Sequence, residues 1–460
     1  MDTSTFVARR QTLRKNVADG AILIMGNDEA PINYTDNVYP FRQDSHFLYF
    51  LGISQANLAA LIEPDGSETL FGVPDSAEDV VWFGEHPTLA DHAAEAGVAR
   101  HAAFAGLGAR LSELRSKGVR VHYLPPYRAQ RILSLAELFA IDSRAAAEGY
   151  SAELVRAVAA QREVKEPAEI AEIEEALSVT AEAYRLAMQA ARPGRSEAEI
   201  AAILQGPALA RDRRQAFNPI VSVRGEVLHN TSYANTLSDG DLLLIDSGAD
   251  SARFYASDVT RTMPVSGRFA KQQRDVYEIV LAAQSAAIAA AAPGVNNREL
   301  HFIAARTIAT GLKDLGLMRG EVEAAVEAGA HALFFPHGLG HMLGQDVHDM
   351  EDLGDVVGYP EGEARSTQFG LAYLRLAREL APNWVITVEP GIYFIPALID
   401  AWRSGGRHSE FIDYERIDAF RSFGGIRIED DVVITADGCR VLGPAIPKTV
   451  EEVEAAMGGE

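Results

Sequence analysis

The sequence of 460 residues contains a single cysteine, Cys439. One thiol can form neither an internal disulfide nor a metal site built from several thiolates. Any bound metal must therefore use aspartate, glutamate or histidine as ligands. Because so few cysteines fit a reducing compartment, we expect a cytoplasmic protein.

Basic residues are scarce relative to acidic ones. The chain has 42 Lys and Arg against 65 Asp and Glu, which gives a net charge of −23 at neutral pH. The resulting electrostatic field repels nucleic acids and anionic membrane surfaces. We therefore expect neither a nucleic acid nor a membrane as a partner.

The sequence also lacks long apolar runs. The richest stretch, Leu281–Ala292, is short, mostly alanine and interrupted by polar residues. The basic segment Met1–Asn16 is not followed by an apolar region with a small-residue cleavage site, so we expect neither a membrane span nor secretion. A content of 47% hydrophobic and 23% charged residues is typical of globular domains, and the length favours two or three of them.

The N-terminal third alternates strand-like and helical patterns. Ala21–Met25 reads as a strand, and Ala59–Ile62 and Thr69–Val73 flank a Pro-Asp-Gly turn as a hairpin. A long amphipathic helix is then predicted from Pro167 to the Pro193-Gly194 pair. We therefore predict a small α/β domain over residues 1–160 and a second domain over residues 161–460.

The C-terminal part contains an internal repeat. Pro193-Gly194 and Pro293-Gly294 each follow an alanine-rich helical run, and they are 100 residues apart. Each pair precedes another predicted helix, which carries Glu199-Ile200 in one copy and Glu299-Leu300 in the other. These matches predict a duplicated helix-and-sheet unit with a central site where its two halves meet.

Each copy also contributes two carboxylates. Asp246 and Glu389 end apolar strand-like runs, and Asp258 and Glu429 follow downstream. Taken singly, each acid could be a solvated strand end or turn. Four such groups turned into the protein would repel one another unless cations balanced them, and two divalent ions supply the matching charge. The set therefore predicts a two-metal cluster.

A glycine-rich segment provides the neutral ligand candidate. His337 and His341 have the spacing of the helical zinc-protease motif, but Gly338 and Gly340 disfavour a helix and no glutamate follows His337. The glycines allow the backbone to pass close to a metal that one imidazole coordinates, or they form a structural turn. The segment does not match the dinucleotide-binding fingerprint.

Several motifs together resemble the pita-bread metallopeptidases of the prolidase and aminopeptidase P group. They are Asp-x-Gly at 246–248, Ser-Asp-Val-Thr-Arg-Thr at 257–262, His-Gly-Leu-Gly-His at 337–341, Val-His-Asp at 347–349, Thr-Val-Glu-Pro-Gly-Ile-Tyr at 387–393 and Gly-Gly-Ile-Arg-Ile-Glu-Asp at 424–430. Phe41–Gly52 is similar to the first domain of that group. The resemblance implies an α/β (α+β) fold, with a small N-terminal α/β domain and a C-terminal pita-bread domain that contains the duplicated repeat.

The resemblance also implies the metal site. The ligands it implies are Asp246, Asp258, His341, Glu389 and Glu429. Asp258 and Glu429 are expected to bridge two divalent ions per chain. Manganese is the favoured ion because most donors are oxygens, and zinc and cobalt are alternatives.

The remaining implied residues serve the reaction. Glu389 also carries a proton, His229 and His348 lie beside the substrate, and Arg427 lies near the cluster. A bridging hydroxide would attack the scissile carbonyl, an imidazole would stabilise the oxyanion, and an acid would protonate the leaving proline nitrogen. The alternative for both histidines is ordinary packing.

The expected substrates are short proline-containing peptides, and the leading hypothesis is an Xaa-Pro dipeptidase. Arg375 lies 14 residues before Glu389, in a segment that resembles the place where prolidases hold the arginine for the dipeptide carboxylate. The alternative for Arg375 is a position on a helix face beside an acid. The runner-up function is aminopeptidase P, which Val80–Gly84 also fits, and relatives suggest a homodimer.

Two other hypotheses leave the filled ligand positions unexplained. They are a non-catalytic pita-bread module that binds peptides and a metal-free hydrolysis like that of creatinase.

The sequence departs from the pattern of the prolidase and aminopeptidase P group near the expected substrate pocket. The interval from Asp246 to Asp258 is one residue longer than the usual spacing in that group, and we assign the extra residue to a bulge at 250–253. The loop before His229 is shorter, Phe217 replaces a tyrosine, and Asn230 replaces an aromatic residue.

Overall fold

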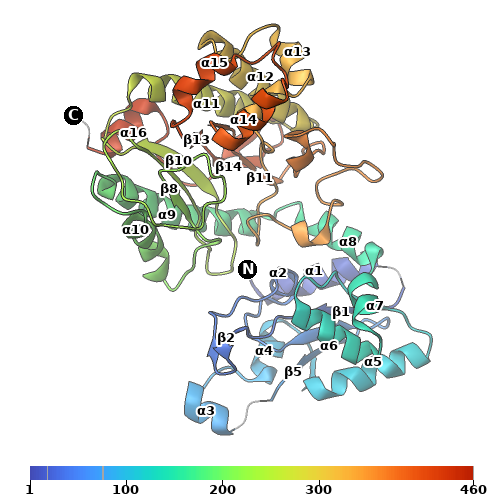
Figure 1. Ribbon diagram of the computed structural model, residues 1–460. Helices are drawn as coiled ribbons and strands as arrows, with labels where there is room; N and C mark the ends of the chain where they lie inside the picture. Colours follow the sequence, from blue (N-terminus) through green and yellow to red (C-terminus); the bar gives the residue numbers. More distant parts are fainter. Residues whose placement is uncertain (18, 75–76, 459–460) are drawn as a thin grey trace. The chain divides into compact units, whose positions relative to one another are not determined.

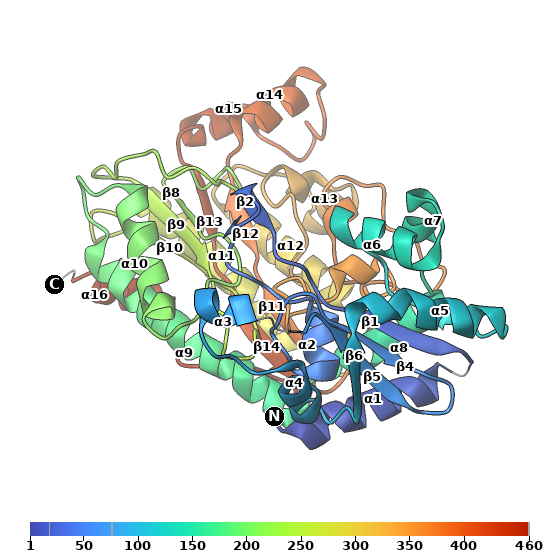
Figure 2. The same ribbon diagram turned by 90° about the horizontal axis from the view of Figure 1, so that it is seen from below.

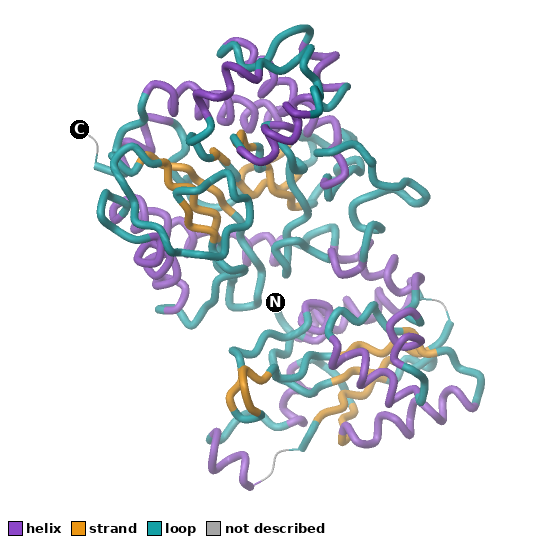
Figure 3. Tube along the Cα trace, in the orientation of Figure 1, coloured by secondary structure: helices purple, strands orange, loops and turns teal. Residues whose placement is uncertain are grey.

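The structure is a computed structural model that describes residues 1–17, 19–74 and 77–458. Its internal contacts divide the chain into two units (Figure 1). Unit 1 comprises Met1–Arg162 with Asp352–Gly354, and unit 2 comprises Glu163–Glu351 with Asp355–Glu460. In each unit the strands lie among helices (Figure 3).

Unit 1 alternates helices and strands in the way that the sequence predicted. Its elements are α1 (Thr3–Asn16), β1 (Ala21–Met25), β2 (Pro31–Tyr34), β3 (Asn37–Val38), α2 (Ser45–Leu51), β4 (Ala59–Ile62), β5 (Glu68–Gly72), α3 (Ala77–Phe83), α4 (Leu89–Glu95), β6 (Arg100–Ala103), η1 (Phe104–Gly106), α5 (Leu107–Ser116), β7 (Val121–His122), α6 (Ala129–Phe139), α7 (Ser143–Glu148) and α8 (Ala152–Arg162).

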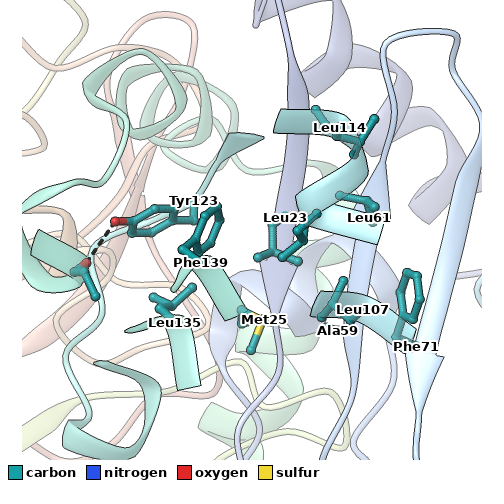
Figure 4. Packing of buried hydrophobic residues seen from close by; sticks show 13 residues of the cluster. Leu23, Met25, Ala59, Leu61, Phe71, Leu107, Leu114, Tyr123, Leu135 and Phe139 are labelled. Atoms are coloured by element: carbon teal, nitrogen blue, oxygen red, sulfur yellow. Dashed lines mark hydrogen bonds between the residues drawn. The ribbon is translucent and has the colours of Figure 1, made fainter. Parts of the chain in front are cut away.

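A mixed five-stranded sheet with the order β6-β5-β4-β1-β7 forms the centre of unit 1. The predicted hairpin is confirmed as the antiparallel pair β4–β5, and its second strand begins one residue earlier than expected. Apolar side chains of β1 and β4 meet those of α5 and α6 in a buried core, in which Phe139 lies beside Tyr123 and Leu135 (Figure 4). The Tyr123 hydroxyl donates a hydrogen bond to the Ala146 carbonyl at 3.0 Å, which satisfies the one polar group of that ring.

Unit 2 is larger. Its elements are α9 (Pro167–Ala190), α10 (Glu197–Leu209), β8 (Ile220–Ser222), β9 (Leu242–Ser247), β10 (Val259–Pro264), α11 (Lys271–Ala290), α12 (Asn297–Asp314), α13 (Val322–Glu327), η2 (Ala330–Leu333), η4 (Leu371–Tyr373), β11 (Val385–Val388), β12 (Gly391–Tyr393), α14 (Pro396–Ser404), α15 (Tyr414–Ile417), η5 (Asp418–Phe420), β13 (Gly425–Arg427), β14 (Asp430–Ile434), β15 (Cys439–Val441) and α16 (Val450–Ala456). The short helix η3 (Glu351–Leu353) begins in unit 2 and ends in unit 1.

The predicted duplication of unit 2 is confirmed. Each copy begins with a helical pair, α9–α10 in the first and α11–α12 in the second. The linking turns contain Gly194 and Gly294, which both adopt positive φ, and their amides donate to Leu237 and Leu380 at 2.8 Å. Helix α10 packs on β8, and α11 packs on β11 and β12 (Figure 2).

The strands of the two copies form three small sheets. Their orders are β10-β9-β8, β11-β14-β15 and β12-β13, and all of their pairings are antiparallel. The register aligns Asp246 with Thr260 in the first copy and Val388 with Asp430 in the second. It therefore places each pair of predicted ligands at or directly beside the ends of paired strands.

The β9–β10 connection explains the Asp-x-Gly motif. A Cβ atom on Gly248 would lie 1.6 Å from the Ser257 carbonyl oxygen, so only glycine allows the two chain segments to approach. Between the two strands, Asp250 and Ala256 form an isolated bridge. Phe254 adopts a φ of 62°, so the chain makes a tight turn directly after residues 250–253.

Among the described residues, none of the helices is both long and apolar enough to cross a membrane. The loop 374–382 is not helical, so the alternative that placed Arg375 on a helix face is wrong, although an acid, Glu351, does contact it. Its backbone instead pairs with the turn that contains Gly294, and Asn296 forms a bridge with Glu379. The repeat therefore determines the path of this loop.

Candidate active site

The five predicted metal ligands lie at the ends of strands or directly beside them. Asp246 is on β9, and Asp258 immediately precedes β10. Glu389 follows β11, and Glu429 lies between β13 and β14. His341 lies in the glycine-rich segment, which is not helical, as the sequence predicted.

These side chains converge. Ligand atoms of Asp258, His341 and Glu429 lie within 4.8 Å of one another, and all three residues are buried. The Nε2 atom of His341 is 3.4 Å from an Asp258 oxygen and 3.8 Å from a Glu389 oxygen. Carboxylates from both copies of the repeat therefore surround one imidazole.

Backbone contacts hold His341 against β11. The Thr387 amide donates to the His341 carbonyl at 3.0 Å, and the Glu389 amide donates to the Leu339 carbonyl at 2.8 Å. A Cβ atom on Gly340 would lie 2.0 Å from the Thr387 carbonyl oxygen. Glycine at 340 is thus required for this close approach, which brings the imidazole to the carboxylates.

Neighbouring polar residues orient the two predicted bridging acids. The Thr260 hydroxyl donates to Glu429 at 2.7 Å, and the Glu429 amide donates to the Thr260 carbonyl at 3.1 Å. The Asp258 amide donates to the Asp431 carboxylate at 3.0 Å. Such supporting contacts fix the geometry of metal-binding carboxylates.

Without cations, the buried carboxylates of the cluster repel one another. Burial and the charge of Glu429 raise the pKa of Asp258 well above its usual range. Burial and Glu389 do the same to the pKa of Glu429, and burial and Asp246 raise the pKa of Glu389 to about 8. Burial lowers the pKa of His341, which favours the neutral imidazole that metals bind.

Over the described ranges, two buried carboxylate oxygens of the cluster lack a hydrogen-bond donor. Within residues 1–17, 19–74 and 77–458, the Oδ1 atoms of Asp246 and Asp258 have no hydrogen-bond partner. Buried polar atoms without a partner are costly, and cations relieve both this cost and the mutual repulsion of the acids. The donor set of four carboxylates and one imidazole fits hard divalent ions.

Arg427 is held rigidly beside the cluster. Its guanidinium donates to the Thr260 hydroxyl at 2.9 Å, to the Tyr393 hydroxyl at 2.9 Å and to Asp246 at 2.5 Å. The Tyr393 hydroxyl is also 2.9 Å from the Nε2 atom of His337. A fixed positive charge and a polar chain therefore border the carboxylates on one side.

All nine predicted site residues line one cavity of about 910 Å³, a size typical of sites for small molecules and peptides. Its lining includes His229 from the β8–β9 connection and His348 and Arg375 from the segment between His341 and β11. Apolar side chains of α14 and of Phe369 and Ile395 form another part of the wall. The cavity thus combines charged groups with an apolar surface.

Residues 171–436 match the model of metallopeptidase family M24, over more than half of the chain. The chain belongs to metallopeptidase family M24. Residues 6–122 match the aminopeptidase P N-terminal domain. This agrees with the resemblance read from the motifs, and the pita-bread fold of unit 2 is the fold of the group.

Relatives of this M24 chain include both kinds of proline-directed peptidase. The chain is 33% identical to the Xaa-Pro dipeptidase of Homo sapiens over an alignment of 471 positions, which covers 98% of this chain and 91% of that protein. It is also 33% identical over 446 residues to the probable Xaa-Pro aminopeptidase of Sordaria macrospora, with 95% and 91% covered.

Solved structures of aminopeptidase P resemble the M24 chain over its whole length. The enzyme from Escherichia coli has a TM-score of 0.82 at 30% identity, with 100% of this chain and 98% of that chain covered. The enzyme from Pseudomonas aeruginosa has a TM-score of 0.82 at 29% identity, with the same coverage.

Sequence reasoning considered His337 beside His341 but gave it no role, although this residue lines the cavity. Sequence reasoning missed Tyr393, which contacts His337, and Thr260, which supports Glu429. Both lie inside the quoted motifs, so their position in those motifs was the available signal. Glu351 lies outside them, and its contact with Arg375 could be seen only in the structure.

Proposed function

We propose that this chain hydrolyses the peptide bond between an N-terminal residue and a proline in second position. The observation that carries the proposal is the convergence of five ligand-type side chains from both repeats on one cavity that also holds histidine and arginine. Relatives named as Xaa-Pro dipeptidase and aminopeptidase P support the choice of substrate.

The site is suited to divalent metal, and we propose two ions per chain. Asp246, Asp258, His341, Glu389 and Glu429 would hold them, with manganese favoured over zinc or cobalt because the donors are mostly oxygens. A similar structure is that of zinc-substituted Escherichia coli aminopeptidase P in complex with product. When bound, such ions activate water and polarise the scissile carbonyl.

The residues around the cluster have complementary proposed roles. Burial lowers the pKa of His229, so its neutral imidazole can donate a hydrogen bond to the developing oxyanion. His348 also lines the cavity and is a second candidate donor. Arg427 keeps a fixed positive charge beside Asp246. These groups favour the charge distribution of the transition state over that of the substrate.

Glu389 is the proposed proton carrier. Its position supports this role, because a Glu389 oxygen lies 3.8 Å from the Nε2 atom of His341, beside the proposed metal site. The leaving proline nitrogen needs a proton, since it leaves poorly as an anion. Glu389 lines the cavity and can deliver that proton to the nitrogen.

The length of the substrate depends on Arg375. As a guanidinium in the cavity wall it can bind the terminal carboxylate of a dipeptide, which favours the dipeptidase. Its ion pair with Glu351 favours the second candidate, aminopeptidase P, because an acid already lies on the guanidinium. Both candidates cleave the same type of bond.

Three broader proposals accompany the function. We propose residues 1–160 and 161–460 as the two domains of the chain. We also propose that the protein is cytoplasmic, because Cys439 is the only thiol in the sequence. We also propose a homodimer. Val81, Trp82 and Phe83 of α3 are more than 70% exposed and offer an apolar surface for association.

Metal analysis combined with peptide hydrolysis tests the function. The purified chain is expected to bind two divalent ions and to release the first residue from Ala-Pro or Ala-Pro-Ala, but not from peptides with alanine in second position. If the manganese-loaded chain releases nothing from either proline peptide, the proposal is wrong.

A further inference from the structure

Arg375 lies in a small charged group at the wall of the cavity. Its Nη1 atom donates to Glu351 Oε1 at 2.6 Å and also to Oε2. Oε2 is in turn 3.3 Å from the Nδ1 atom of His348. One carboxylate therefore bridges two of the three residues that the sequence assigned to the substrate, His348 and Arg375.

Glu351 is a permanent negative charge in this position. Burial acts to raise its pKa, but the hydrogen bond with His348, the charge of His348 and the charge of Arg375 outweigh it and lower the pKa to about 2. The carboxylate is thus ionised at neutral pH. The local charge of Arg375 and Glu351 together is zero before any substrate arrives.

The pair is accessible to a ligand. The side chains of Arg375, Glu351 and His348 are 35%, 34% and 37% exposed, so each keeps contact with water. Ion pairs with this exposure are weak and can be rearranged at small cost. Within the part of the chain that the structure describes, Nη1 makes both hydrogen bonds that Arg375 donates, so the guanidinium keeps further donor atoms for a substrate.

A dipeptide and a longer peptide meet this group differently. The terminal carboxylate of a dipeptide must displace Glu351 or lie beside it, which brings two like charges together. A longer peptide presents a neutral amide at the same place, whose N–H can donate to Glu351 and whose carbonyl can accept from Arg375. The group therefore disfavours the dipeptide and accommodates the longer chain.

We infer that Glu351 is a specificity-determining residue that competes with the substrate carboxylate for Arg375 and shifts the preference from Xaa-Pro dipeptides towards peptides that continue beyond proline. The inference rests on the proposed function and refines its substrate class. Glu351 would raise the KM of dipeptides relative to the KM of longer peptides.

A merely structural role for Glu351 makes a different prediction. If the carboxylate only orients His348, its removal lowers kcat for all substrates by the same factor. The ratio of kcat/KM for Ala-Pro to kcat/KM for Ala-Pro-Ala then stays constant. This ratio separates competition for Arg375 from any shared effect on catalysis.

The test measures that ratio for manganese-loaded chains. Glu351→Gln removes the charge but keeps the shape, and we expect it to raise the ratio by about tenfold, mainly through a lower KM for Ala-Pro. Glu351→Asp keeps the charge, so it should raise the ratio less. In the double variant Glu351→Gln with Arg375→Ala, the gain should disappear, because the guanidinium is needed for it.

A matched control breaks a similar ion pair that is not in the cavity wall. Arg378, three residues after Arg375, donates to Glu163 at 2.7 Å, and Glu163→Gln should leave the ratio unchanged. An unchanged ratio in folded Glu351→Gln would overturn the inference while hydrolysis of both peptides continued. Absence of hydrolysis in the unsubstituted chain would overturn the proposed function as well.

Discussion

The two copies of the repeat in unit 2 share a scaffold but differ in their connections. In both, a glycine turn joins two helices, and its amide donates to a distant loop at 2.8 Å. In both, an antiparallel pair of strands presents two acids. The shared parts therefore supply the carboxylates of the candidate metal centre.

The connections before the first acid are unequal. Residues 223–241 join β8 to β9 in the first copy and contribute His229. Residues 343–384 take a longer path from the bridge at Met342 to β11 in the second copy, and they contribute His348, Glu351 and Arg375. The comparison indicates that the duplicated parts supply the candidate metal ligands and that the unequal loops supply the residues proposed for the substrate.

A second difference lies in the cores of the copies. Buried Ala201 of α10 corresponds, 100 residues later, to buried His301 of α12. The His301 ring stacks on Phe335 at 5.0 Å and lies 6.0 Å from the ring of His331. The second copy therefore holds a buried histidine pair beside the segment that leads to His337.

The largest effect is expected from the shared part. Glu429→Gln removes one of the four charges that balance two ions, so metal content should fall and activity should drop by more than about 10³-fold, beyond the loss of a single hydrogen-bond donor. Metal analysis and peptide hydrolysis measure both. Glu379→Gln, an exposed acid ten residues before Glu389, is the control. Retention of two ions with normal activity would remove Glu429 from the ligand set.

A smaller effect is expected from the unequal loops. His348→Ala removes one preorganised donor, so kcat should fall by roughly 10²-fold while metal content stays nearly constant. Metal analysis alongside steady-state rates distinguishes this from ligand loss, with the exposed His101→Ala as the control. If the variant lost metal and kept its rate per bound ion, His348 would belong to the cluster and the division between scaffold and loop would fail.

The smallest effect concerns the histidine pair. Burial and the charge of His408 lower the pKa of His331 to about 4, below its unfolded value of about 6.5. The unfolded chain therefore takes up this proton first as the pH falls. Between pH 7 and pH 5, His331 should lower the free energy of unfolding by about 2 kcal/mol.

Urea unfolding of the metal-free chain and of His331→Leu at both pH values tests this. The variant should lose about 2 kcal/mol less than the unsubstituted chain on acidification, because it has no such proton to bind. His101→Leu should behave like the unsubstituted chain. Equal losses in the His331 variant and the unsubstituted chain would show that the pair is not a source of acid sensitivity.

Much of the fold was predictable because its signals are local. Ala21–Met25 and Ala59–Ile62 are the observed strands to the residue, and Pro167 begins α9 as a residue at the first helical position. The repeat was readable because both copies need the same glycine turn. The irregular turn at Phe254 was less predictable, since its shape depends on contacts across the hairpin.

The sequence by itself determined which acids and histidines stand at strand ends and in glycine-rich approaches, because strand periodicity and glycine's lack of a Cβ atom act over a few residues. Only the tertiary structure decided which side chains meet. The contacts of Arg375 with Glu351 and of Arg427 with Tyr393 join segments 24 and 34 residues apart. Such contacts depend on how whole loops pack, and no local pattern encodes that packing.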